Sequence, residues 1–102
     1  MEKIRYESVY ILKPILTKEE INKMIERLSA VIDDKGKVIE IQNIGIKNLA
    51  YLIKGFAQGH YLIMDFEIDS DKYKDGISQI EQRIRTFEEV IKFIVIRKED
   101  WN

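Results

Sequence analysis

The amino-acid sequence predicts an α+β fold in which an antiparallel sheet of four strands carries two helices on one face. Apolar residues make up 45% of the 102 positions, so residues 1–102 can bury the core of a single domain. Four short segments are rich in β-branched and aromatic residues, and two longer segments repeat their apolar residues at three-to-four spacing. Their order along the chain is strand, helix, strand, strand, helix, strand.

The first strand is expected at Lys3–Leu12, which is short and rich in β-branched and aromatic residues. Its core-facing row is ambiguous, because both of its rows carry apolar side chains. A central place in the sheet, with both faces partly covered, would explain this weak alternation. Pro14 ends the strand, because proline has no N–H to donate to a neighbouring strand.

The first helix is predicted over residues 17–34. Thr17 followed by Glu20 has the spacing of a capping box, and Gly36 is expected to end the helix in a left-handed conformation. The apolar stripe consists of Ile21, Met24, Ile25, Leu28, Val31 and Ile32. The stripe accounts for Met24 as a core residue rather than a ligand.

The middle of the chain, residues 45–68, is interpreted as two strands and a long connection. The strand before it covers residues 37–46, and Gly45 inside it indicates a bulge or a close backbone approach. After the connection, a strand that opens at Gly59 alternates clearly as far as Ile68.

The second helix is predicted over residues 69–87, with Asp69 or Ser70 as its cap. Gly76 weakens it by roughly 1 kcal/mol relative to alanine, so its first turns are expected to fray. The last strand is expected at residues 90–98.

Each half of the chain is therefore a strand–helix–strand unit with a crossover long enough to be right-handed. Two such halves interleave into the ferredoxin-like βαββαβ arrangement. The face without helices should stay open. Strands 37–46 and 90–98 should form the edges, where a partner chain could pair. Residues 99–102 are expected to form a short tail.

Composition excludes several classes of function. The chain has no cysteine, a single histidine and no glycine-rich phosphate loop, so we expect no enzyme, metal site, cofactor or small-molecule substrate. There is no apolar run of membrane-spanning length and no signal-peptide pattern, and the lack of cysteine is compatible with the cytosol. Seventeen Lys and Arg stand against 18 Asp and Glu, so RNA binding should be local or shared with a basic partner.

The connection between the two middle strands is the candidate site. Lys47 and Lys54 flank an apolar and aromatic group centred on Tyr51, a pattern that suits the phosphates and bases of single-stranded or irregular RNA. A hairpin end that is simply packed explains the same residues. Lys3, Arg5, Lys47 and Lys54 are expected to lie near one end of the sheet.

Two other binding classes share this fold. Lys54-Gly55-Phe56-Ala57 matches the first half of an RRM ribonucleoprotein motif, but Gln58 and Gly59 stand where an aromatic and an aliphatic residue belong. An RRM-like binder of single-stranded RNA is therefore one alternative. A small-molecule regulatory domain of the ACT type is another, although no glycine-lined pocket is indicated at a helix start.

Several motifs carry a resemblance over nearly the whole chain. They are Arg5-Tyr6-Glu7, Leu12-Lys13-Pro14 with Leu16, Gly36, Gly45-Ile46-Lys47-Asn48-Leu49-Ala50-Tyr51-Leu52-Ile53 and Gln58-Gly59-His60-Tyr61. With these motifs the chain resembles the bacterial small-subunit ribosomal protein number six family. It departs from the family pattern at Leu52, where proline is usual, and at Asn48, where a second basic residue is usual.

The resemblance implies a structural ribosomal protein, located on the ribosome in the cytoplasm. Such proteins bind the central domain of small-subunit ribosomal RNA as a heterodimer with ribosomal protein number eighteen, a small basic chain. The residues that it places at RNA or partner contacts are Lys3, Arg5, Lys47, Asn48, Leu49, Tyr51, Leu52, Ile53, Lys54 and His60. Among them, Leu49, Leu52 and Ile53 are assigned to the partner interface or to local packing.

Overall fold

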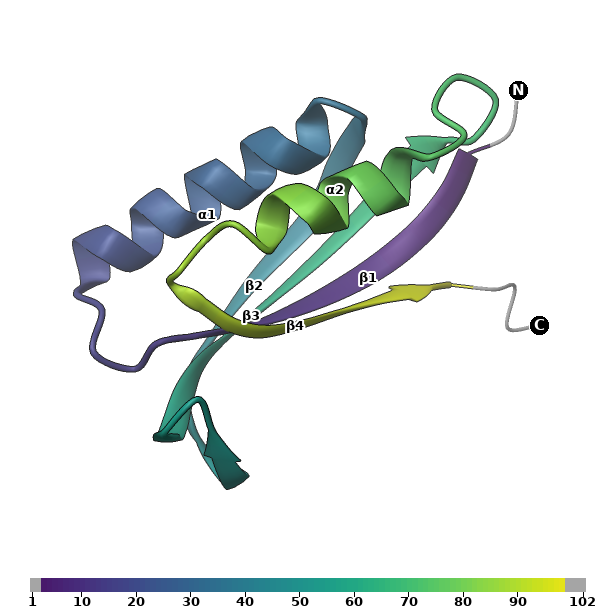
Figure 1. Cartoon of the computed structure of the whole chain (residues 1–102). Coiled ribbons are helices and arrows are strands. Elements are labelled where there is room, and N and C mark those ends of the chain that lie inside the picture. The colour runs from purple at the N-terminus through teal and green to yellow at the C-terminus, as the bar shows by residue number, and fades with distance from the viewer. Residues whose placement is uncertain (1–2, 99–102) are drawn as a thin grey trace.

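The computed structural model describes residues 3–98 and confirms the predicted element order. The elements are β1 (Lys3–Leu12), α1 (Lys18–Asp33), β2 (Gly36–Ile53), β3 (Phe56–Asp69), α2 (Gly76–Ile84) and β4 (Val90–Arg97). The strands form one sheet in the order β2–β3–β1–β4, and every neighbouring pair is antiparallel. Both helices lie on the same face of the sheet, and β2 and β4 are its edges, as predicted (Figure 1). The expected tail, residues 99–102, lies outside the described residues.

The central place of β1 resolves its ambiguous alternation. Tyr10 and Leu12 are fully buried beneath the helices, while Ile11, on the other face, is still only 8% exposed. Ser8 lies on the helix side and donates its hydroxyl to the carbonyl of Met64 at 2.9 Å, which satisfies a polar group in the core.

Helix α1 begins and packs as the sequence predicts. The backbone N–H of Glu20 donates to Oγ1 of Thr17 at 3.1 Å, and the N–H of Thr17 donates to Oε1 of Glu20 at 2.8 Å, which forms the capping box. The buried side chains of its stripe are Ile21, Met24, Leu28, Val31 and Ile32. They pack on the apolar row of β3, which consists of Leu62, Met64, Phe66 and Ile68.

Gly36 was predicted to end the first helix in a left-handed conformation, and this role is wrong. The helix ends at Asp33, its C-cap residue Asp34 keeps right-handed dihedral angles, and Gly36 is the first residue of β2. A Cβ at Gly36 would collide with the carbonyl oxygen of Glu67 on β3. The glycine therefore permits close strand pairing and does not end the helix.

The prediction of a long connection between the two middle strands is also wrong. Strand β2 continues to Ile53 and β3 already begins at Phe56, so Gly59 lies within β3, opposite Lys47. Gly45 does mark a bulge, because the pairing register shifts between Asn43 and Gly45.

Helix α2 is much shorter than predicted. The carboxylate of Asp69 accepts the backbone N–H groups of Asp71 and Lys72, which closes a turn instead of capping a helix. The helix starts only at Gly76, and its N-cap residue Asp75 makes no side-chain capping bond.

Candidate nucleic-acid and partner interface

The distinctive feature of the molecule is a hairpin extension, residues 47–58, that projects beyond the rest of the sheet. The pairing of β1 with β3 ends at Leu12 and His60, whereas β2 and β3 continue past this point (Figure 1). The two strands join at Lys54 and Gly55, whose φ angles are 50° and 86°, as a type I′ turn requires.

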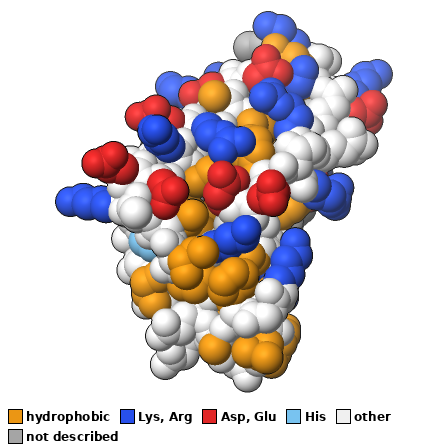
Figure 2. Space-filling model, turned by 60° about the vertical axis from the view of Figure 1, so that its left-hand side comes forward, with side chains coloured by type: hydrophobic (Ala, Val, Ile, Leu, Met, Phe, Trp, Pro, Cys, Tyr) orange, Lys and Arg blue, Asp and Glu red, His pale blue; other side chains and the backbone are white. Residues whose placement is uncertain are grey.

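The hairpin extension exposes apolar surface. Tyr51 and Leu52 are 65% and 66% exposed, while Leu49, Ile53 and Phe56 are half-buried. Figure 2 shows hydrophobic side chains gathered towards the lower end of the molecule, with charged side chains more frequent above them. Exposed apolar surface of this kind marks a contact with another molecule more often than a packed hairpin end.

Two lysines lie over aromatic rings in this region. Nζ of Lys47 is 5.8 Å from the ring centroid of Tyr61, and Nζ of Lys92 is 5.9 Å from that of Tyr51. The second contact joins the hairpin extension to β4, so the hairpin curves across the end of β1. Positive charge beside an exposed ring is the combination that RNA can use.

The other polar residues predicted for the site make local contacts. Nε2 of Gln58 donates to Oδ1 of Asn48 at 2.9 Å across the hairpin. Nε2 of His60 is 2.6 Å from Oδ1 of Asn43. Burial lowers the pKa of His60, which favours the neutral form of the ring. By strand alternation His60 points to the helix side of the sheet, away from Lys47.

Lys3 and Arg5 do not join the hairpin residues, which corrects the expectation of one basic end. Lys3 pairs with Asp69, whereas Leu12, at the far end of β1, pairs with His60. Nine residues of strand separate the two ends by about 30 Å. Nζ of Lys3 instead forms an ion pair with Glu67 at 3.5 Å.

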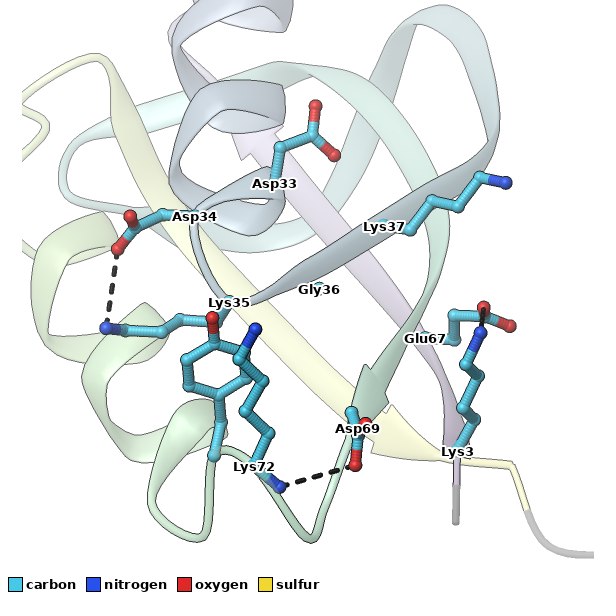
Figure 3. Close-up of a pocket in the computed structure, with 10 residues that line it drawn as sticks. Lys3, Asp33, Asp34, Lys35, Gly36, Lys37, Glu67, Asp69 and Lys72 are labelled. Atoms are coloured by element: carbon cyan, nitrogen blue, oxygen red, sulfur yellow. Dashed lines mark hydrogen bonds and ion pairs between the residues drawn. The ribbon is translucent and has the colours of Figure 1, made fainter. Parts of the chain in front are cut away.

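A cavity of about 260 Å³ lies at this distant end of the sheet (Figure 3). Its charged lining consists of Lys3, Lys35, Lys37 and Lys72 with Asp33, Asp34, Glu67 and Asp69. The two signs balance, and acids such as Asp34 already pair with a neighbouring lysine. The cavity therefore has no clear preference for an anion.

The open face of the sheet combines apolar and acidic side chains. Ile94 and Ile96 of β4 are about half exposed, and they lie across from Val9 and Glu7 of β1. Asp65 of β3 is 9% exposed and accepts from Nζ of Lys98 at 3.1 Å. Glu7 and Asp65 both pair with Lys98, so the surface that this face offers is chiefly apolar, which suits a protein partner.

Sequence reasoning missed Lys92 and Arg85. Lys92 belongs to the ring contact with Tyr51, and the guanidinium of Arg85 lies 5.7 Å from the ring centroid of Phe93. The alternation of β4 was a signal that Lys92 shares a face with Ile94. Nothing in the sequence indicated that the hairpin extension curves far enough to bring Tyr51 to Lys92.

Neither helix within residues 3–98 is long and apolar enough to cross a membrane. The same residues contain no group of three or more His, Asp or Glu side chains placed to hold a metal ion. Fold and site together define a ferredoxin-like binding domain, in which a basic, aromatic hairpin projects from a sheet with an open face.

Comparison with known proteins places this domain in a family. The family model for ribosomal protein S6 matches residues 5–97, and the chain belongs to this family. It is 35% identical over 97 residues to small ribosomal subunit protein bS6 of Gloeobacter violaceus, covering 94% of this chain and 97% of that one. Its identity to the bS6 protein of Acidobacterium capsulatum is 32%, over 93% of this chain and 65% of the longer relative.

Solved structures agree with this assignment. The crystal structure of 30S ribosomal protein S6 from Thermotoga maritima superposes with a TM-score of 0.86 at 27% sequence identity. The match covers 95% of this chain and 89% of that one. An Arabidopsis thaliana protein matches with a TM-score of 0.58 at 13% identity, which shows a shared fold alone.

Proposed function

We propose that this chain is a structural, non-catalytic protein of the bacterial small ribosomal subunit, located in the cytoplasm. It binds the central domain of small-subunit ribosomal RNA together with ribosomal protein number eighteen. The observation that carries the proposal is the hairpin extension, which exposes Tyr51 and Leu52 beside Lys47 and Lys54 in a member of the S6 family.

The charge distribution supports a shared RNA interface. The chain has a formal net charge of −1, so the protein as a whole does not attract RNA. Its hairpin extension offers only a few cations, and the open face offers apolar side chains such as Ile94 and Ile96. A basic partner on the open face would supply the positive field that this chain lacks.

The test is a filter-binding titration of the RNA central domain at several salt concentrations, with and without the basic partner. RNA affinity is expected to be weak for this chain alone and much higher with the partner. Lys47→Ala should lower the salt slope of the complex by about one unit, the expectation for one lost phosphate contact. Lys18→Ala, which removes an exposed lysine from α1, is the matched control and should change neither affinity nor slope.

Tyr51 tests the apolar part of the same interface. Tyr51→Ala should weaken assembly with little change in salt slope, since the lost term is stacking or packing, whereas Tyr51→Phe should retain most of the affinity. Tight and specific RNA binding by the chain alone, unaffected by Lys47→Ala and Tyr51→Ala, would contradict the proposal and favour an RRM-like function.

A further inference from the structure

A groove runs along the outer edge of β4, outside the residues that the hairpin motif singles out. Its volume is about 380 Å³. It is lined by β4 residues 90–95, by the end of α2 and its cap, and by Lys54 at the tip of the hairpin. Three segments distant in sequence therefore converge on a single depression, because the hairpin curves towards β4.

The charge of this groove is one-sided. Its cations are Lys54, Arg85 and Lys92, and Glu81 is the only acid in the lining. No ion pair within residues 3–98 involves any of the three cations. The groove thus differs from the cavity at the other end of the sheet, where lysines and carboxylates balance. An excess of unpaired cations is complementary to a polyanion.

Two of the three cations each lie over an aromatic ring. The guanidinium of Arg85 lies over Phe93 on the helix side of β4, and Lys92 lies over Tyr51 on the open side. By strand alternation, consecutive residues Lys92 and Phe93 point to opposite faces, so the two cations stand on either side of the strand edge. A guanidinium beside a ring can offer a planar face to a base and its N–H groups to a phosphate.

The backbone adds a third kind of donor. Strand β4 is bonded only to β1, so alternate N–H and C=O groups along its outer edge have no neighbouring strand. Its edge N–H groups therefore face the groove between the two cations.

We propose that this groove binds one strand of RNA, with phosphates on Lys54, Arg85 and Lys92 and a base stacked against Arg85. This inference rests on the proposed function and extends it. The RNA-binding surface then continues from the hairpin around the turn to the edge of β4. The cation excess argues against an added protein strand, whose backbone is neutral.

The test compares two double variants that remove equal charge. Arg85→Gln with Lys92→Gln changes the groove, and Lys18→Gln with Lys23→Gln changes exposed lysines of α1. Affinity of the full chain with its basic partner for the RNA central domain is measured by filter binding. With a single-strand slope of about 0.7 per contact, two lost contacts lower affinity about 25-fold at 0.1 M salt and the slope by about 1.4. The control pair should stay within about twofold of the wild type.

A second measurement uses a different probe. A ten-nucleotide oligouridylate is titrated into the isotopically labelled full chain, and amide shifts are followed by NMR. Shifts should concentrate in residues 90–95 and at Arg85, and they should be absent from the groove variant while its remaining spectrum stays folded.

The outcomes separate the two proposals. If the groove variant and the control variant both bind ribosomal RNA as tightly as the wild type, the proposed role of the groove is overturned and the proposed function still stands. Failure of the wild type to bind ribosomal RNA even with the partner would overturn both. If the groove variant loses partner binding and the wild type shows no shifts on adding oligouridylate, the RNA assignment is overturned and the groove is a protein contact.

Discussion

Gly59 joins the hairpin extension to the sheet, and its replacement by alanine has a calculable effect. A Cβ at this position would collide with Cγ2 of Ile11 on β1. Its next neighbours, the carbonyl oxygen of Leu12 at 3.5 Å and Cδ2 of Leu49 at 3.7 Å, are ordinary contacts. One side chain therefore determines the cost. Overpacking of this kind costs about 1–3 kcal/mol. Because Gly59 has no positive φ, alanine gains about 0.4–1 kcal/mol through the unfolded chain.

These magnitudes predict that Gly59→Ala destabilises the wild type by up to about 2.6 kcal/mol, and that the effect of Gly59→Ala changes sign once Ile11 is shortened. In an Ile11→Ala background the obstructing methyl is gone, and Gly59→Ala should be neutral or stabilising. The assay is urea denaturation of all four chains of the double-mutant cycle, followed by circular dichroism. Equal destabilisation by Gly59→Ala in both backgrounds would refute the reasoning. Gly45→Ala is the control, since Gly45 has a φ of 100° and open space around it, so Ile11→Ala should not rescue it.

Two further predictions concern the core and the histidine. Leu28→Ala should destabilise the protein by about 2–5 kcal/mol in chemical denaturation, because Leu28 is fully buried at the centre of α1; a loss below about 1 kcal/mol would contradict its central place. Burial lowers the pKa of His60 in the folded state, so the unfolded chain binds this proton more tightly. The stability contributed by the neutral His60 is therefore present above about pH 6.5 and is lost as the pH falls through the folded pKa. His60→Asn should therefore flatten the fall in unfolding free energy between about pH 7.5 and 5 relative to the wild type, and parallel curves for the two chains would count against this linkage.

Much of the fold was predictable because local and global signals agree. Helix α1 carries both its capping box and a single apolar stripe, and the core row of β3 alternates without interruption. The hairpin extension was missed because it has no covered face. Beyond Leu12 nothing packs on it as a third strand, so Leu49, Tyr51 and Leu52 lose the alternation that identifies a strand. The start of α2 was misplaced because the Asp69 carboxylate, a plausible cap by type, bonds within its own turn.

Only those residues of the candidate site that are close together in the sequence could be predicted. Lys47, Tyr51 and Lys54 stand together along the chain, so composition suffices to find them. The separation of Lys3 and Arg5 from the hairpin follows from strand register, which turn geometry fixes over the whole sheet. The groove at β4 needs Lys54, Arg85 and Lys92 from three elements, and it exists only because the hairpin curves.

The central position of the first strand has a consequence for biosynthesis. Strand β1 is translated before any other element, yet it pairs on one side with β3 and on the other with β4, where Tyr6 meets Arg97. Contacts so distant in sequence carry the largest loop-closure cost and slow the folding of small domains. The emerging chain can form α1 and the β2–β3 hairpin early, but it cannot close its sheet until β4 has left the ribosomal exit tunnel. The pairing of β1 with β4 is therefore a late step of folding during synthesis.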